Sequence, residues 1–584
     1  MRQTFIFTFF LQILLISAVG QKSTHNLEKH IRVLCSDTLE GRKVGTLGEQ
    51  KAAKYIRNIF KEQNLELLGE DGFLNFEVIT KVEATQKNKF SLFNIDYKLG
   101  EDYLPINLTK NDSLFANVYF AGYGFDIETD SLKWCDYPST FHINRMWVVV
   151  IRGVPDPQNE NSKFYPFASD AQKIEMARKR GAKGIVLVSP KYLSEEDGLM
   201  PLRIVQSLEN KSIIAINASR KAASKLFWNY GINFDNVEKN YNYPMEKKGV
   251  FIPAKIANAT ELKYEKSTAS NVVGLIEGNN PVLKDEYIII AANHDHIGYG
   301  DLNLNPHKTD TIAIHSGANN NASAVAMLLD LSEKISKNRR RLKRSVVFVS
   351  FSAKEYQYLG SKVFLKEELI PISKIKYMIN LNMVGGLDSE RNIYINGVGT
   401  AKEFDSVLSH LNRKYQFNLI QNRFGYSASD ANNFFQKSIP VLTFSTGVQE
   451  FYNTPYDDIS KINFVGIREL SAFVYDLVVN LSQRENSFKF QEQPMPQNRF
   501  ADLKVDLGIE YKSTKDYVMV NNILQNSIAE QSGLTLEDKI TKINGQLIKD
   551  RSDFERILSS LYVGQIVSIE FYRDEKKHTI ILQL

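Results

Sequence analysis

The chain has 584 residues, which at roughly 150 residues per domain argues for about four domains and against a single compact fold. Apolar residues make up 43% and charged residues 24% of the sequence, which excludes a disordered chain and a multi-span membrane protein. The net charge of 72 − 67 = +5 is too small for a nucleic-acid binder, and two cysteines exclude a disulfide-dense scaffold or a cysteine-built zinc finger.

The N-terminus has the order of features found in an export signal. Arg2 precedes an apolar run from Phe5 to Ile16, and the small residues Ala18 and Gly20 stand just before a predicted cut. The alternative, a membrane anchor, is disfavoured because the run is shorter than the roughly 20 residues that span a bilayer. We therefore predict a signal peptide over residues 1–20 and a periplasmic or extracellular protein without an integral membrane span after cleavage.

Export would place Cys35 and Cys135 in an oxidising compartment, where they could form a disulfide. A disulfide requires the two residues to lie close together, and the sequence does not give their distance. Two separate buried thiols are the alternative, and both remain open.

The first two blocks after the signal differ in their periodicity. Residues 26–89 carry apolar side chains at helical spacing. Residues 90–252 change to strands and turns, with a buried strand over Met146–Ile151, a helix over Asp170–Arg180 and a strand over Gly184–Ser189. This pattern predicts a β-rich unit inserted after an N-terminal helical segment.

In the third block, residues 253–484, apolar strands alternate with helices such as Ala322–Lys337. The predicted strands are Tyr287–Ala292, Ser345–Phe351, Lys376–Asn382 and Val441–Phe444. Such alternation predicts an α/β fold with a mixed, mostly parallel sheet sandwiched by helices. Residues 485–499 are polar and predict a linker, and residues 500–584 form a small strand-rich unit.

Short polar motifs stand at the ends of the predicted strands of the third block. In chain order they are Asn293-His294-Asp295-His296-Ile297-Gly298, Gly317-Ala318-Asn319-Asn320-Asn321-Ala322-Ser323, Phe351-Ser352-Ala353-Lys354-Glu355, Asn380-Leu381-Asn382-Met383-Val384-Gly385 and Tyr452-Asn453-Thr454-Pro455. In order and spacing they resemble metallopeptidase family twenty-eight, the di-zinc aminopeptidases related to glutamate carboxypeptidase. The resemblance implies a zinc aminopeptidase-like fold, with residues 90–252 as the inserted protease-associated (PA) domain of that family.

At the metal site the sequence departs from this family. The resemblance assigns five zinc ligands and one general base to six positions of the chain. Glu355 is the one ligand that is retained, and Lys354 stands at the base position. The other four ligand positions hold asparagine: Asn293, Asn320, Asn382 and Asn453.

These replacements remove the chemistry that zinc hydrolysis requires. Zinc binds thiolate, imidazole or carboxylate donors and needs at least three from the protein, whereas an asparagine offers a neutral amide oxygen. Hydrolysis also needs a carboxylate to accept a proton from the metal-bound water, and a lysine ammonium accepts none. We therefore expect no catalytic residue, no bound metal and no cofactor. Lys354 is expected to project into the space of the metal ions and to pair with Glu355 or contact carbonyl groups.

Four histidines lie near these metal-ligand positions in the sequence and offer an alternative. A pocket shifted toward His294, His296, His307 and His315 could bind one ion. However, His294 should point to the opposite face of its strand from the ligand positions. His296 belongs to the family motif, where a structural role is expected, and His307 and His315 lie in a polar loop, where a solvated histidine is usual.

The final block predicts a peptide-binding module. Leu507-Gly508-Ile509 resembles the carboxylate-binding loop of PDZ domains, and Ile543-Asn544-Gly545 resembles their usual strand and turn. A PDZ domain accepts a peptide as an added strand and holds its terminal carboxylate against backbone amides. The alternative is a PDZ domain that only packs against the core.

Three functions follow from these observations. The favoured one is an exported pseudopeptidase that binds peptides or the C-terminus of a protein partner. Binding would use the former active-site cleft, the PDZ domain or both. The alternatives are an active zinc-dependent aminopeptidase with an atypical site, and an architectural envelope protein. Bound zinc would favour an active enzyme, whereas peptide binding without zinc would favour the pseudopeptidase over the architectural protein.

Overall fold

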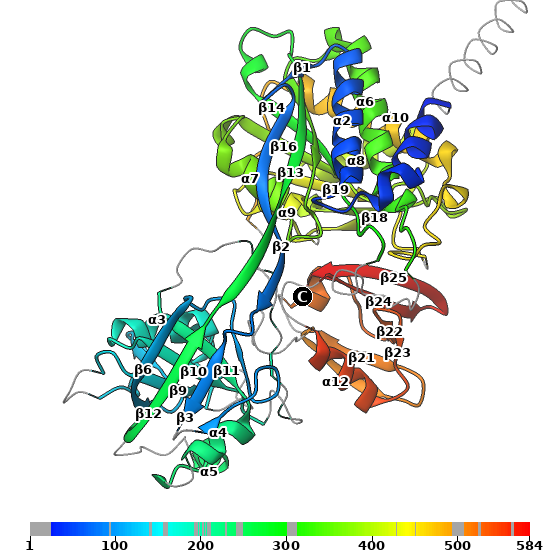
Figure 1. The fold of residues 1–584 in the computed structure, drawn as a ribbon. Coiled ribbons are helices and arrows are strands. Elements are labelled where there is room, and N and C mark those ends of the chain that lie inside the picture. Colours follow the sequence, from blue (N-terminus) through cyan, green and yellow to red (C-terminus); the bar gives the residue numbers. More distant parts are fainter. Residues whose placement is uncertain are drawn as a thin grey trace, which may run out of the picture.

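The computed structural model describes residues 25–583 except 93–94, 139–142, 156–161, 192–196, 198, 201, 203, 205, 207–211, 228–229, 241–248, 301–311, 428, 450, 493–506, 524–526 and 562–565. The predicted signal peptide and His307 lie outside the described residues. Three large sheets organise the rest of the chain (Figure 1). None of the helices in these residues combines the length and hydropathy needed to cross a membrane.

A nine-stranded sheet forms the core and confirms the expected mixed α/β class. Its order is β1-β13-β15-β14-β16-β19-β17-β18, and β2 pairs with β13 outside this path. The bounds are β1 Glu66–Leu67, β2 Phe73–Ala84, β13 Leu262–Ile276, β14 Tyr287–Asn293, β15 Ser345–Phe351, β16 Ile375–Leu381, β17 Asn392–Asn396, β18 Asn418–Asn422 and β19 Val441–Ser445. The central strands β15, β14, β16 and β19 run parallel, while β13 and β17 pair with them antiparallel.

Alternate residues of each central strand are buried against helices on opposite faces of the sheet. On β14, Ile288 and Ile290 belong to the core on one face, together with α2 (Leu47–Glu62), α6 (Ala324–Lys337), α8 (Phe404–Tyr415) and α10 (Phe464–Gln483). Ile289 packs on the other face with α7 (Leu359–Glu367) and α9 (Ala431–Phe435). Because both faces are covered, the strands consist almost wholly of apolar residues.

Residues 89–260 contribute a separate eight-stranded sheet of order β4-β3-β12-β6-β9-β10-β11-β5. Its bounds are β3 Lys89–Leu92, β4 Ile95–Asp96, β5 Tyr103–Pro105, β6 Asp112–Phe120, β9 Trp147–Ile151, β10 Gly184–Val188, β11 Ile214–Ala218 and β12 Val250–Thr260, with the helices α3 Asp170–Lys179, α4 Arg220–Phe227 and α5 Phe234–Asn240. A small hairpin, β7 (Asp126–Glu128) and β8 (Lys133–Cys135), completes it.

The second sheet extends past the boundary expected at residue 252. Strand β12 continues to Thr260 because buried and exposed side chains keep alternating along it. The long antiparallel ribbon of β2 and β13 then leads back to the core (Figure 1). Its identity as a PA domain remains a prediction. Cys135 lies in this unit and Cys35 near the N-terminus of the core, and both thiols are free.

The C-terminal unit is a six-stranded sheet of order β20-β21-β22-β24-β25, with β23 paired to β22. The bounds are β20 Ile509–Ser513, β21 Val518–Ile523, β22 Lys539–Ile543, β23 Gln546–Leu547, β24 Ile566–Arg573 and β25 Lys576–Gln583, with helices α11 Ile528–Gln531 and α12 Arg551–Ser560. The start of the segment predicted as a linker packs on the core instead. The ring of Phe488 lies 5.5 Å from that of Tyr377, because an aromatic residue within a polar stretch can still bury its ring.

Candidate functional site

The ends of the parallel core strands bring the predicted site residues together. Asn293 ends β14, Lys354 and Glu355 follow β15, and Asn382 follows β16. Asn320 comes from the helical turn before α6, and Asn453 from the loop after β19. The carboxyl edge of an open α/β sheet is the usual place for a ligand site, since loops from several strands meet there.

Three of the four asparagines are locked in a buried amide network. The amide nitrogen Nδ2 of Asn320 donates to Oδ1 of Asn453 at 2.7 Å. Nδ2 of Asn321 donates to Oδ1 of Asn293 at 2.8 Å, while Oδ1 of Asn321 accepts from the backbone N–H of Met383 at 2.8 Å. Asn382 is half-buried and lines a neighbouring pocket. Asn320 and Asn453 are therefore hydrogen-bond partners of each other, and Asn293 is bound by the neighbouring Asn321.

Lys354 enters this network as a buried cation. Its Nζ donates to Oδ1 of Asn320 at 3.1 Å and lies 3.4 Å from Oε1 of Glu355, so the expected pairing is observed together with a carbonyl contact. The geometry with Glu355 is that of an ion pair rather than a hydrogen bond. Burial alone would lower the pKa of Lys354, but the charges of Glu355 and its neighbours raise it above the ordinary value. Lys354 is therefore protonated at neutral pH.

Asp295 organises the backbone beneath the ion pair. Its carboxylate accepts the backbone N–H groups of Lys354 at 3.1 Å and of Glu355 at 3.3 Å. Burial, followed by the charge of Glu355, raises the pKa of Asp295 to about 7. Two effects thus oppose each other at Asp295: the charge of Glu355 disfavours its ionised form, and the two backbone N–H donors favour it.

These residues do not fit the pair of zinc ions that the family resemblance implies. The amide oxygens of Asn293, Asn320 and Asn453 each already accept a hydrogen bond. A protonated Lys354 lies within hydrogen-bond distance of Asn320, where it would repel a divalent cation. Glu355 is a single carboxylate, and zinc needs at least three good donors.

The histidines do not build a replacement site within the described part of the chain. His294 points away from the amides: its ring nitrogens contact Oγ of Ser350 at 3.0 Å and Oε1 of Glu49 at 3.3 Å. His296 and His315 are buried, and burial lowers the pKa of both rings. No group of three or more His, Cys, Asp or Glu side chains suited to a metal is found in these residues.

Sequence reasoning overlooked two residues that shape the network. Asp457 accepts the backbone N–H groups of Asn319 at 2.7 Å and Asn320 at 2.9 Å, which fixes the turn that carries Asn320. Asn321 connects Asn293 to the loop after β16. An acidic residue shortly after the motif at Asn453 was a usable signal for Asp457, whereas nothing local marks Asn321 among three consecutive asparagines.

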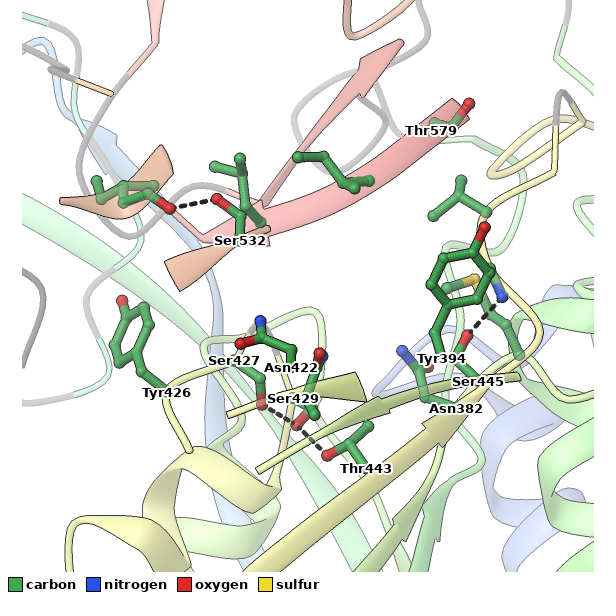
Figure 2. A pocket seen from close by; sticks show the side chains of 17 residues that line it. Asn382, Tyr394, Asn422, Tyr426, Ser427, Ser429, Thr443, Ser445, Ser532 and Thr579 are labelled. Atoms are coloured by element: carbon green, nitrogen blue, oxygen red, sulfur yellow. Dashed lines mark hydrogen bonds between the residues drawn. The ribbon is translucent and has the colours of Figure 1, made fainter. Parts of the chain in front are cut away.

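A cavity of about 120 Å³ lies beside Asn382, between the core and the C-terminal unit (Figure 2). Figure 2 shows core side chains such as Tyr426 and Ser429 on one side and Ser532 and Thr579 on the other. Hydroxyl groups of Ser427, Ser429 and Thr443 form a hydrogen-bonded row, at 2.8 and 3.3 Å, along the core wall. No sequence pattern indicates this cavity, because its two walls come from units that are far apart in the chain.

The predicted carboxylate-binding loop precedes β20. Leu507 is buried, and its carbonyl accepts the backbone N–H of Ala529 at 2.8 Å. Gly508 has φ +72° and a Cβ there would lie 2.2 Å from Cβ of Ser527, so this position needs glycine. Ile509 begins β20, which pairs only with β21 among the described strands and so forms a sheet edge.

Comparison with protein families identifies both units. Residues 271–478 match the model of peptidase family M28, and residues 505–584 match that of the PDZ domain. The chain thus contains a region that matches peptidase family M28, followed by a PDZ domain. A curated relative, the probable periplasmic serine protease do/HhoA-like of Haemophilus influenzae, is 30% identical over 84 residues. That match covers 14% of this chain and 18% of the relative's length.

The chain is also similar to solved structures of aminopeptidases. An aminopeptidase from Aneurinibacillus sp. strain AM-1 is 18% identical, with a TM-score of 0.47, over 81% of this chain and 97% of that one. The zinc aminopeptidase BSAP from Bacillus subtilis is 17% identical, with a TM-score of 0.42, over 80% and 98%. A peptidase M28 precursor from Shewanella amazonensis SB2B is 14% identical, with a TM-score of 0.38, over 82% and 99%.

Proposed function

We propose that this protein is an exported pseudopeptidase that keeps the M28 fold and binds no zinc. It binds peptides or a protein C-terminus through the former active-site cleft, the PDZ domain or both. The observation that carries the proposal is the contact of Lys354 with Asn320 at 3.1 Å and with Glu355 at 3.4 Å. Of the six positions that the family resemblance assigns to ligands and base, one holds an ammonium and one a carboxylate, where the family has several carboxylates and two dications.

Loss of hydrolysis follows from the same contacts. A metallopeptidase needs a metal to acidify water and a carboxylate to take its proton. Lys354, at the position of that base, is held protonated by Glu355 and therefore cannot accept a proton from water. Three of the amide oxygens at the ligand positions already accept a hydrogen bond: that of Asn453 from Asn320, that of Asn293 from Asn321 and that of Asn320 from Lys354.

Peptide binding is supported by the PDZ domain and its geometry. β20 is the edge strand of its sheet among the described strands, and a peptide joins such a domain by adding to an edge. The loop at Leu507, Gly508 and Ile509 precedes that edge. Export remains part of the proposal, resting on the predicted signal peptide.

Zinc content separates this proposal from an active enzyme. We expect near-zero zinc by elemental analysis of the mature protein after equilibration with zinc, and no aminopeptidase activity. We also expect zinc binding in a variant with the family's residues restored, namely Asn293→His, Asn320→Asp, Lys354→Glu, Asn382→Asp and Asn453→His. The matched control carries the same substitutions at the four asparagine positions but keeps Lys354. It should bind zinc more weakly, because the ammonium remains. One or two tightly held ions in the natural protein would overturn the proposal.

A further inference from the structure

We infer that two adjoining turns at the amino-terminal edge of the core sheet dock the protein peripherally on an anionic lipid bilayer. The turns span residues 277–286, between β13 and β14, and residues 338–344, between α6 and β15, and together they form the basic edge. In Figure 1 this edge lies at the end of the core where β13 ends, away from the C-terminal unit. The inference goes beyond the proposed function, because neither the loss of zinc nor peptide binding requires it.

The basic edge concentrates the positive charge of the chain. These two short segments hold six Lys or Arg and three Asp or Glu, a net charge of 6 − 3 = +3, whereas all 584 residues together have +5. Clustered cations produce a local field that an even spread of the same charge does not. The edge therefore complements the surface of a bilayer that contains anionic lipids.

Four of the six cations form no ion pair with a described acidic residue. The other two are paired, Lys284 with Glu277 and Arg344 with Glu286, each at 2.7 Å. The remaining carboxylate of the edge, Asp285, is exposed. It stands against three exposed arginines and one half-buried lysine, namely Arg339, Arg340, Arg341 and Lys343.

A helix C-terminus also attracts cations, but α6 has its own. Lys334 and Lys337 occupy its last turn, and Asn338 is its C-cap. Lys337 is also paired with Glu333. The three arginines follow the cap as a separate short turn, Arg339–Arg341, beyond the last helical turn where the macrodipole acts. Stabilisation of α6 therefore does not account for them.

The core holds both turns in place, so the cations are presented on a fixed surface. The backbone N–H of Asn279 donates to the carbonyl of Leu342 at 2.9 Å, and its Nδ2 donates to the carbonyl of Arg340 at 2.6 Å. Nε2 of Gln483, at the end of α10, donates to the carbonyl of Arg341 at 3.1 Å. These bonds use the backbone of the arginine turn and leave its side chains exposed.

An exposed apolar residue distinguishes a bilayer from a soluble anion. Val282 is 76% exposed in the turn that is hydrogen-bonded to the arginine turn, and it follows the exposed Pro281. Its backbone N–H donates to Oδ1 of Asn280 at 3.0 Å. An apolar side chain beside cations gains from burial at the boundary of headgroups and acyl chains, and a free phosphate or another soluble polyanion offers no such burial.

Docking at this edge leaves the amide network open to solvent and partners. Strand β14 begins at Tyr287 beside the basic edge and ends at Asn293 in the network. Seven residues of strand separate the two ends by about 20 Å. A bilayer at the basic edge therefore lies opposite the former active-site cleft.

Co-sedimentation of the mature chain with vesicles tests the inference. We expect binding to phosphatidylcholine vesicles with about 30% phosphatidylglycerol to be at least about tenfold tighter than to pure phosphatidylcholine, because each cation near an anionic surface contributes about fivefold. Raising the salt concentration from about 0.1 M to about 1 M should release the protein, because it shortens the screening length. Equal binding to both vesicles, or none to the anionic ones, would overturn the inference.

Paired substitutions locate the contact. Arg339→Gln with Arg340→Gln should weaken binding to the anionic vesicles about twentyfold. The matched control, Lys512→Gln with Lys515→Gln, removes the same charge from exposed positions of the C-terminal unit and should change binding less than about twofold. All four positions are exposed, so both variants should fold. Equal losses in the two variants, or no loss in the first, would show that the basic edge is not the contact.

A tryptophan at position 282 reports contact with lipid. Val282→Trp should shift its fluorescence to shorter wavelength on anionic vesicles, because an indole ring favours the membrane interface. Leu47→Trp, at a 67% exposed position at the start of α2, is the control and should show no shift. The absence of a shift at position 282 would refute the contact.

Heparin, a soluble polyanion, separates the two sources of negative charge. Protein that binds heparin but not the anionic vesicles has an anion patch without a bilayer contact, and the inference is then wrong. Zinc content and peptide affinity of the Arg339 and Arg340 double variant should equal those of the natural protein. Failure of the vesicle tests therefore leaves the proposed function intact.

Discussion

The ion pair of Lys354 and Glu355 allows a quantitative test of the buried network. Replacing Lys354 by Met leaves the carboxylate of Glu355 without its cation in a site where its side chain is 7% exposed. The amide oxygen of Asn320 also loses its donor. Breaking a buried pair on one side costs about 3–5 kcal/mol, because the remaining charge is desolvated and unpaired.

The double variant isolates the pair from other effects of the substitution. Lys354→Met with Glu355→Gln removes both charges, so we expect it to recover most of the loss, giving a coupling energy of about 2–3 kcal/mol in a double-mutant cycle. Lys366→Met, at an exposed position of α7, is the matched control and should change stability by less than about 0.5 kcal/mol.

Thermal and urea unfolding at pH 7, followed by circular dichroism, measure these differences. At about 2–4 °C per kcal/mol for a domain of 150–250 residues, Lys354→Met should lower Tm by about 6–20 °C. If Lys354→Met is as stable as the natural protein, or if the double variant is no more stable than the single one, the ion pair does not hold the site and the charge argument fails.

Three further predictions follow from individual contacts. The free energy of unfolding should fall as pH rises from about 4 to 7, because the pKa of Asp295 is about 7 in the folded state and about 3.9 in the unfolded state. The stabilisation is complete below the unfolded pKa and is lost as pH rises through the folded pKa. Asp295→Asn should flatten this slope in unfolding curves, and an unchanged slope would assign it to other groups. His294→Phe should cost about 1–3 kcal/mol, because it removes a partner of the buried Glu49, yet leave zinc uptake by the restored variant unchanged; loss of that uptake would place His294 at the site. Gly41→Ala should destabilise by more than about 1 kcal/mol, and by more than Gly100→Ala, because both positions have positive φ but only at Gly41 would a Cβ lie 2.5 Å from a backbone oxygen; equal losses would show that φ alone matters.

Much of the fold was accessible from the sequence because it rests on local periodicity. The apolar runs at Ser345–Phe351 and Val441–Phe444 were predicted as buried strands, and the structure has them at Ser345–Phe351 and Val441–Ser445. The predicted helix at Ala322–Lys337 begins later, at Ala324, because the preceding asparagines take up the turn that carries Asn320. Period and length decide such elements before any tertiary contact forms.

The chemical character of the site was also determined by residue type alone. The resemblance assigns four asparagines to ligand positions and Lys354 to the base position, and these residue types define which donors are present however the chain folds. Strand alternation was enough to place His294 on the far side, where it meets Glu49. What no pattern supplied was the partner of each amide, since Asn453 meets Asn320 across 133 positions of the chain.

Only the tertiary structure decided where the PDZ domain sits. Its fold follows from its own 80 or so residues, about the size of a small independent domain. Its docking through Lys576 and Ile580 depends on surfaces contributed by both units, and neither surface has a sequence signature. The sequence by itself determined which side chains stand at the strand ends of the core and the presence of a PDZ domain, while the cavity between the two domains exists only because folding brings their surfaces together.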